Sequence, residues 1–114
     1  MKAHHLTILA VLISGSVLAQ EFDELQIDNA TCSLVRSGTD NHEMIYKGDV
    51  DIGMCFVIVP TTEFHKTYSY CALSGILASK GHVGCEFGYY DKGHQRVSFV
   101  SNKDNLCQFT CIKR

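Results

Sequence analysis

The most uniform pattern in the chain is an unbroken apolar run at 54–60, Met-Cys-Phe-Val-Ile-Val-Pro. A short run of this kind without polar alternation is typical of a strand that is buried on both faces. Just before it, Val50 and Ile52 alternate with aspartates, which predicts a half-buried edge strand. We therefore expect 54–60 to be the middle strand of a sheet, with Cys55 as a covalent anchor and Pro60 at its end.

Beyond this run the apolar positions change to a helical spacing. Tyr70, Leu73 and Leu77 recur every three or four residues, and a lysine followed by a glycine ends the pattern. These features predict one helix over 67–80 that packs on the sheet. Cys71 lies on the inner face of this predicted helix and would tie it to the sheet.

The remainder of the chain has the pattern of a sheet. Strand-forming runs at 83–90 and 95–100 flank a turn that contains glycine, which predicts a β-hairpin. The last run, 106–112, alternates strictly and places Cys107 and Cys111 on one inward face. Residues four apart on a strand are separated by about 13 Å, whereas a disulfide needs Cα atoms within about 7 Å. These two cysteines must therefore have different partners.

The start of the chain has the features of a secretory signal peptide over residues 1–19. A basic residue precedes a nearly continuous apolar segment, and small residues follow at the expected cleavage site. The apolar segment is shorter than the roughly 20 residues that a membrane span requires. We therefore predict one secreted, extracellular domain at 20–114 and no membrane partner.

The segment between the predicted signal peptide and the central run is less regular. Residues 20–28 are acidic and contain no cysteine, so we expect a frayed arm or a short helix. Short strands are expected at 32–36 and 44–46, separated by a cluster of turn-forming residues.

The cysteine content predicts how this small domain is stabilised. An even number of cysteines in a short secreted chain indicates three disulfides rather than a metal site. The six residues are Cys32, Cys55, Cys71, Cys85, Cys107 and Cys111. Six cysteines allow 15 pairings, and the spacing does not select one. We therefore predict an α+β fold, a small disulfide-stapled and mainly antiparallel sheet with one helix packed on it, without metal or cofactor.

Charge and one further motif narrow the possible partners and modifications. The formal net charge is −2, and the lysines are spread singly. Neither feature favours a nucleic acid or an anionic membrane as partner. Asn29-Ala30-Thr31 is an N-glycosylation sequon, so Asn29 is a predicted glycosylation site at the surface.

Aromatic residues in two loops are the candidates for contact with a partner protein. Tyrosine and phenylalanine are common anchors of interfaces. The loop after the central run carries Phe64 and His65, and the tip of the predicted hairpin carries Tyr90 and His94. We predict that these four residues bind the partner, and that Phe64, Tyr68 and Tyr90 are the most exposed aromatic side chains.

An enzymatic alternative rests on the predicted hairpin. Glu86, His94 and Arg96 supply a carboxylate base, an imidazole acid and a phosphate-binding guanidinium, as RNA cleavage requires. Residues 96–99 resemble the arginine-bearing hairpin of the small secreted guanyl-specific fungal ribonucleases. That family has a second histidine on its closing strand, where this chain has Thr-Cys-Ile at 110–112.

Over its whole length the chain is similar to the small secreted cysteine-rich effectors of plant-pathogenic fungi, in particular their biotrophy-associated secreted proteins. The resemblance lies in the signal peptide, the short cysteine-rich domain and the low content of charged residues. It implies a non-enzymatic virulence protein that binds a host protein at the host interface or in the apoplast, with inhibition of a host hydrolase or protease as one form. The alternative is an extracellular ribonuclease-like protein, either active or catalytically dead.

Overall fold

The computed structural model describes residues 21–38, 42–78 and 84–114. The predicted signal peptide and the end of the predicted helix, at 79–80, lie outside these residues. Within the described part of the chain, no helix is long and apolar enough to cross a membrane.

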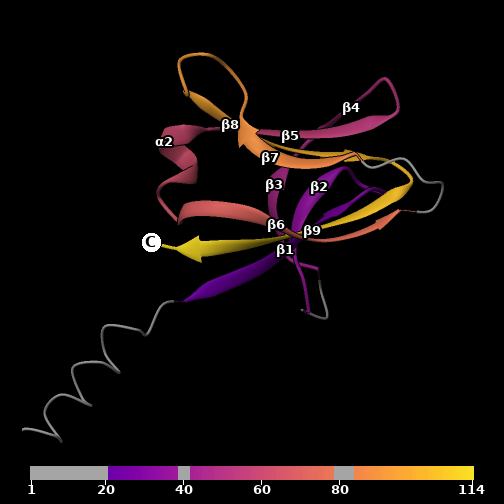
Figure 1. The fold of residues 1–114 in the computed structure, drawn as a ribbon, viewed down its shortest axis with the longest axis horizontal. Helices are drawn as coiled ribbons and strands as arrows, with labels where there is room; N and C mark the ends of the chain where they lie inside the picture. The colour runs from indigo at the N-terminus through magenta and orange to yellow at the C-terminus, as the bar shows by residue number, and fades with distance from the viewer. Residues whose placement is uncertain (1–20, 39–41, 79–83) are drawn as a thin grey trace, which may run out of the picture.

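Two antiparallel sheets form the two layers of the fold (Figure 1). The first has the strand order β3-β2-β1-β9-β6, and its strands are β1 (Phe22–Asp28), β2 (Ser33–Arg36), β3 (Met44–Lys47), β6 (Tyr68–Ala78) and β9 (Asn105–Lys113). The second has the order β4-β5-β8-β7, and its strands are β4 (Asp49–Asp51), β5 (Met54–Pro60), β7 (Cys85–Tyr89) and β8 (Arg96–Asn102). Among the described residues the only helix is the single turn α2 (Thr61–Phe64). The fold is therefore small, disulfide-rich and mainly β, and the expected α+β class is corrected in this respect.

The central apolar run forms β5, an interior strand between β4 and β8, as predicted. Its burial alternates, because Cys55, Val57 and Val59 are buried whereas Phe56 and Ile58 are only partly so. The prediction that both faces are buried is therefore wrong. At β5 only one face is fully buried, and the opposite face remains partly accessible.

The edge strand before it, β4, was predicted correctly in position but not in burial. Val50 is 65% exposed and Ile52 is 89% exposed. Ile52 and Gly53 form the two-residue turn into β5, with φ angles of 53° and 73°. Such a turn favours asparagine and glycine, and a β-branched residue in this conformation is strained.

Replacement of Ile52 with asparagine is expected to raise the free energy of unfolding by about 1 kcal/mol, because asparagine adopts the left-handed conformation more readily. The isoleucine side chain is almost fully exposed, so the change loses little packing. Chemical denaturation of both proteins measures the effect. A destabilised Ile52→Asn variant would show that the turn does not hold strain at this position.

The predicted helix over 67–80 is instead the long strand β6, which pairs with β9 along its length. Two register shifts, at Tyr68/Tyr70 and Leu73/Gly75, interrupt the alternation of the strand. These bulges explain why apolar residues recur at three- and four-residue intervals in a segment that is not helical. Tyr70, Leu73 and Leu77, the supposed buried stripe, are exposed by 58%, 37% and 68%.

The acidic segment after the predicted signal peptide is not a frayed arm. It forms β1, which pairs with β2 on one side and with β9 on the other. Leu25 and Ile27 are fully buried in the core, with exposed fractions of 0% and 1%. Glu24 lies on the outward face of the strand, where its carboxylate accepts a hydrogen bond from Thr110, whereas Asp23 lies on the inward face and accepts a hydrogen bond from Tyr68.

The six cysteines form three disulfides, as predicted. Cys32–Cys55 and Cys85–Cys107 each connect the two sheets, whereas Cys71–Cys111 joins neighbouring strands of the first sheet. Cys107 and Cys111 lie on the same inward face of β9 and bind different partners, which confirms that prediction.

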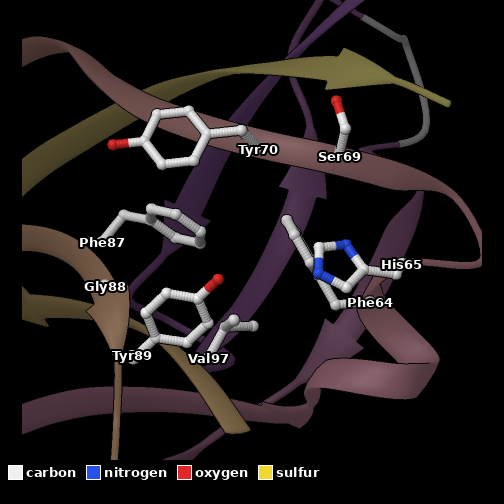
Figure 2. A pocket seen from close by; sticks show the side chains of 8 residues that line it. All are labelled: Phe64, His65, Ser69, Tyr70, Phe87, Gly88, Tyr89 and Val97. Atoms are coloured by element: carbon white, nitrogen blue, oxygen red, sulfur yellow. The ribbon is translucent and has the colours of Figure 1, made fainter. Parts of the chain in front are cut away.

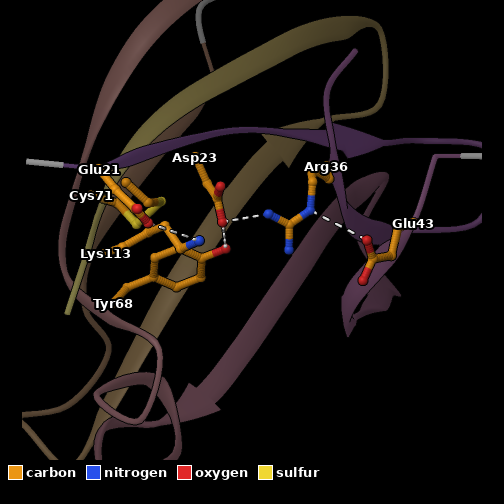
Figure 3. A network of polar contacts seen from close by, with 8 residues as sticks. Glu21, Asp23, Arg36, Glu43, Tyr68, Cys71 and Lys113 are labelled. Carbon is orange, nitrogen blue, oxygen red and sulfur yellow. Dashed lines mark hydrogen bonds and ion pairs between the residues drawn. A yellow bond between two sulfur atoms is a disulfide. The ribbon is translucent and has the colours of Figure 1, made fainter. Parts of the chain in front are cut away.

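A cluster of polar side chains surrounds Asp23, which lies on the inward face of the first sheet near the start of β1 (Figure 3). The carboxylate of Asp23 accepts hydrogen bonds from the hydroxyl of Tyr68, at 2.6 Å, and from the guanidinium of Arg36, which also pairs with Glu43. Burial by itself would raise the pKa of Asp23, but the bonds from Tyr68 and Arg36 outweigh it, so the pKa is lowered. Burial and the bond to Asp23 both raise the pKa of Tyr68.

Because the pKa of Asp23 is lowered in the folded protein, the free energy of unfolding depends on pH. The ionised carboxylate stabilises the fold above the unfolded pKa, near 3.9, and this contribution is lost as the pH falls through the lower folded pKa. We expect urea denaturation to show a free energy of unfolding that decreases below about pH 4, and less steeply in Asp23→Asn. Tyr68→Phe, which removes one donor to Asp23, should show an intermediate slope. Identical slopes in the three proteins would contradict this assignment.

Candidate functional site

A pocket of about 180 Å³ lies where α2, β6 and the β7–β8 hairpin meet (Figure 2). The turn around α2 contributes Phe64 and His65, β6 contributes Tyr70, and the hairpin contributes Tyr89 and Val97. Its complete lining is Phe64, His65, Ser69, Tyr70, Phe87, Gly88, Tyr89 and Val97. Two surfaces that were predicted separately, the loop after β5 and the hairpin, thus form one site.

Phe64 forms the floor of the pocket and is not an exposed anchor. It is only 1% exposed, and its ring centroid lies 5.7 Å from that of Phe87 and 6.2 Å from that of Phe99. Pro60 ends β5 and begins the single turn of α2, and this turn directs Phe64 back into the core. Tyr68 is also fully buried, so the prediction that these two side chains are exposed is wrong.

His65 supplies a polar group at the edge of this apolar pocket. Its Nδ1 lies 3.0 Å from the carbonyl oxygen of Tyr68. A carbonyl oxygen only accepts hydrogen bonds, so Nδ1 carries the proton and the neutral ring keeps a lone pair on Nε2. The second ring nitrogen faces the pocket (Figure 2), where Nε2 is available as a hydrogen-bond acceptor.

The opposite wall is Tyr89, which is held in place by the hairpin tip. The rings of Tyr89 and His94 stack at 4.1 Å with an interplanar angle of 10°. Thr61 connects the tip to α2, because its amide donates to the carbonyl of Gln95 and its hydroxyl to the carbonyl of His94. His94 therefore supports the pocket from behind without lining it.

Asp91 fixes the conformation of the hairpin tip. Its carboxylate accepts hydrogen bonds from the amide of Gln95, at 2.8 Å, and from Nε of Arg96, at 3.1 Å. The bond from Gln95, followed by the bond from Arg96, lowers the pKa of Asp91. The tip is thus ordered by its own side chains before any partner binds.

Tyr90 lies on the other face of the same sheet. It lines a separate shallow hollow with Asp49, Asp51, Phe56 and Ile58, and the guanidinium of Arg96 lies 4.7 Å from its ring centroid. Tyr89 and Tyr90 are therefore neighbours in sequence that face different surfaces, with similar exposures of 53% and 49%.

The pocket contains residues that the sequence did not identify as site residues. Tyr70, Phe87 and Val97 line it together with the predicted Phe64 and His65 and with Tyr89 at the start of the predicted hairpin tip. The alternation of 85–89 would place Phe87 and Tyr89 on one face, but the sequence does not indicate that β6 passes beside them. The sequence pattern predicted a helix over 67–80, so the position of strand β6 beside the hairpin could not be anticipated.

The residues of the ribonuclease alternative do not converge. Glu86 lies opposite Val100 on β8, four residues along that strand from Arg96, which corresponds to about 13 Å. The guanidinium of Arg96 donates a hydrogen bond to Asp91, and the ring of His94 stacks on that of Tyr89 without lining the pocket. The geometry therefore does not assemble a base, an acid and a phosphate-binding group at one point.

The amide group of Asn29, the predicted glycosylation site, makes an internal contact. Its Nδ2, the atom to which a glycan would be attached, donates a hydrogen bond of 2.6 Å to the carbonyl of Asn105. Its Oδ1 is buried without a hydrogen-bond partner among the described residues. Glycosylation at this site remains a prediction.

The lining of the pocket is mainly aromatic. Its lining residues include no carboxylate, amine or thiol, and the polar side chains among them are the imidazole of His65 and the hydroxyls of Ser69, Tyr70 and Tyr89. Across the described ranges, no three histidine, cysteine or acidic residues are grouped to hold a metal ion.

No protein-family model matches the chain, and neither a curated protein nor a solved structure matches it significantly.

Proposed function

We propose that this chain is a secreted, non-enzymatic binding protein that recognises a partner protein by taking one of its side chains into the pocket. The observation that carries this proposal is the preformed aromatic pocket between α2 and the hairpin. Small-molecule sites usually have volumes of about 300–1,000 Å³, and this pocket, at about 180 Å³, is smaller. Its size suits a single inserted side chain.

The rigidity of the walls supports this proposal. Interfaces concentrate their binding energy in a few side chains that fill well-packed pockets, and preorganised walls reduce the entropy lost on binding. Here the ring of His94 stacks on that of Tyr89, and the imidazole of His65 is hydrogen-bonded to the backbone carbonyl of Tyr68. The three disulfides further restrict motion of the fold and suit an extracellular protein.

The partner class follows from the layout of the chain. We propose a host protein at the pathogen–host interface, on the resemblance to secreted fungal effectors, with inhibition of a host hydrolase or protease as one mechanism. Pull-down from host extract with wild-type protein and with Tyr89→Ala tests this part. The expected result is a host protein that the wild type retains and the variant loses.

Selection from a displayed random-peptide library tests the pocket itself. Peptides enriched on the oxidised wild-type protein should bind Tyr89→Ala at least tenfold more weakly, because the variant removes one wall of the pocket. Tyr90→Ala is the matched control, since this neighbouring tyrosine has similar exposure but faces the other surface. Its affinity for the same peptides should be unchanged.

Two results would contradict the proposal. Selected peptides that bind Tyr89→Ala as well as wild type, but lose binding to Tyr90→Ala, would move the interface to the other face of the sheet. Cleavage of RNA by the purified protein that Arg96→Ala abolishes would show an enzyme instead of a binding protein.

A further inference from the structure

The geometry points to an aromatic side chain with a ring N–H or O–H, a tryptophan or tyrosine of the partner, as the occupant of the pocket. This inference rests on the proposed function and specifies which chemistry the pocket selects. His65 is the residue that determines this specificity.

The walls favour an aromatic occupant over an aliphatic one. Phe64, Tyr70, Phe87 and Tyr89 line the pocket together with the imidazole of His65. The ring of Tyr70 meets that of Phe87 edge-on, at 5.6 Å and 90°, and the rings of Phe64 and His65 are 5.3 Å apart. Aromatic rings gain energy from such edge and offset contacts beyond the area that they bury. A planar ring can therefore use more of this lining than a branched aliphatic chain can.

An acceptor that cannot donate favours an occupant that carries a donor. Because Nδ1 of His65 donates to the carbonyl of Tyr68, Nε2 of the neutral ring can only accept. An occupant that covered Nε2 without a donor would leave this nitrogen desolvated and unpaired, which is unfavourable. The hydroxyls of Ser69, Tyr70 and Tyr89 also line the pocket, and a hydroxyl can donate or accept, so these groups do not select in the same way. The ring N–H of tryptophan and the O–H of tyrosine both satisfy Nε2.

Indole and 1-methylindole are the probes that test this inference, because the methyl group removes only the donor and adds little bulk. Binding is followed from the changes in the backbone amide shifts of Phe87, Gly88 and Val97, which line the pocket. Indole is expected to bind the wild-type protein about fivefold more tightly, as one net hydrogen bond provides. In His65→Ala the two probes should bind equally, which separates the hydrogen bond from the effect of the methyl group.

Two further variants make the test decisive. His65→Phe keeps a ring beside Phe64 but has no acceptor, so it should also abolish the preference, and it replaces His65→Ala if that variant does not fold. Tyr89→Phe keeps its ring and should preserve the preference. Equal affinities of the two probes for wild type, or a preference that persists without His65, would overturn the inference. A preference lost only in Tyr89→Phe would likewise overturn it and assign the acceptor to the Tyr89 hydroxyl.

The same peptide selection distinguishes failure of this inference from failure of the proposed function. Enriched peptides that contain no tryptophan or tyrosine, yet lose binding to Tyr89→Ala, would overturn the inference and leave the proposed function intact. Peptides that are indifferent to Tyr89→Ala would instead overturn the proposed function.

Discussion

Replacing Phe64 with alanine is expected to lower the free energy of unfolding by about 3–5 kcal/mol, the usual range for a phenylalanine deleted from a core. Its side chain is 1% exposed, and its ring packs near those of Tyr68 on β6 and Phe87 on β7. The single turn of α2 has no other buried residue, so the turn would lose its attachment to the core. The change should therefore unfold α2 and disrupt the pocket together.

Chemical denaturation followed by near-ultraviolet circular dichroism measures this loss. Tyr89→Ala is the matched control, because it removes an aromatic side chain of the same pocket that is 53% exposed. Its cost should be below about 1.5 kcal/mol, as expected for a half-exposed side chain. A Phe64→Ala variant as stable as Tyr89→Ala would mean that Phe64 is a surface residue.

Removal of the disulfide between Cys71 and Cys111, by changing both residues to alanine, is expected to lower the free energy of unfolding by about 4 kcal/mol. This bond joins residues 40 apart in sequence, more than the other two disulfides, so it restricts the unfolded chain most. Both cysteines are fully buried, and the loss of their sulfur atoms adds a packing term. Small domains have a total stability of only about 5–15 kcal/mol, so this effect is large.

Thermal and urea denaturation of the double variant under oxidising conditions test this expectation. The Cys32→Ala/Cys55→Ala variant is the comparison, since that bond joins residues 23 apart and should cost somewhat less in the chain-entropy account. A larger loss for the 32–55 pair would show that connecting the two sheets matters more than loop length.

The regular strands were predictable because alternation and turn residues agree there. The β7–β8 hairpin and β9 were located from sequence within a few residues, and the inward faces of Cys107 and Cys111 followed from alternation. β6 was not predictable, since two bulges give it the spacing of a helix and tertiary pairing with β9 decides its structure. β1 was missed because its acidic residues indicated an exposed segment, whereas Glu24 lies on the outward face of an interior strand and Asp23 points inward to Tyr68 and Arg36.

The candidate site was only partly predictable for the same reason. His65 was foreseen as a loop residue, and the hairpin tip as a surface, from local patterns alone. The direction of Phe64 depends on one helical turn, and the contribution of Tyr70 depends on the path of β6. Local sequence patterns do not contain either of these long-range arrangements.

The position of β9 between β1 and β6 determines the order in which the domain can acquire its covalent bonds. Two of the three disulfides use cysteines of β9, so neither can close before this strand has been synthesised. Cys32 and Cys55 both precede it and are able to pair earlier. Such a topology has a high contact order and folds slowly. Oxidative folding should therefore begin with the Cys32–Cys55 bond. The first sheet should stay incomplete until β9 inserts between β1 and β6.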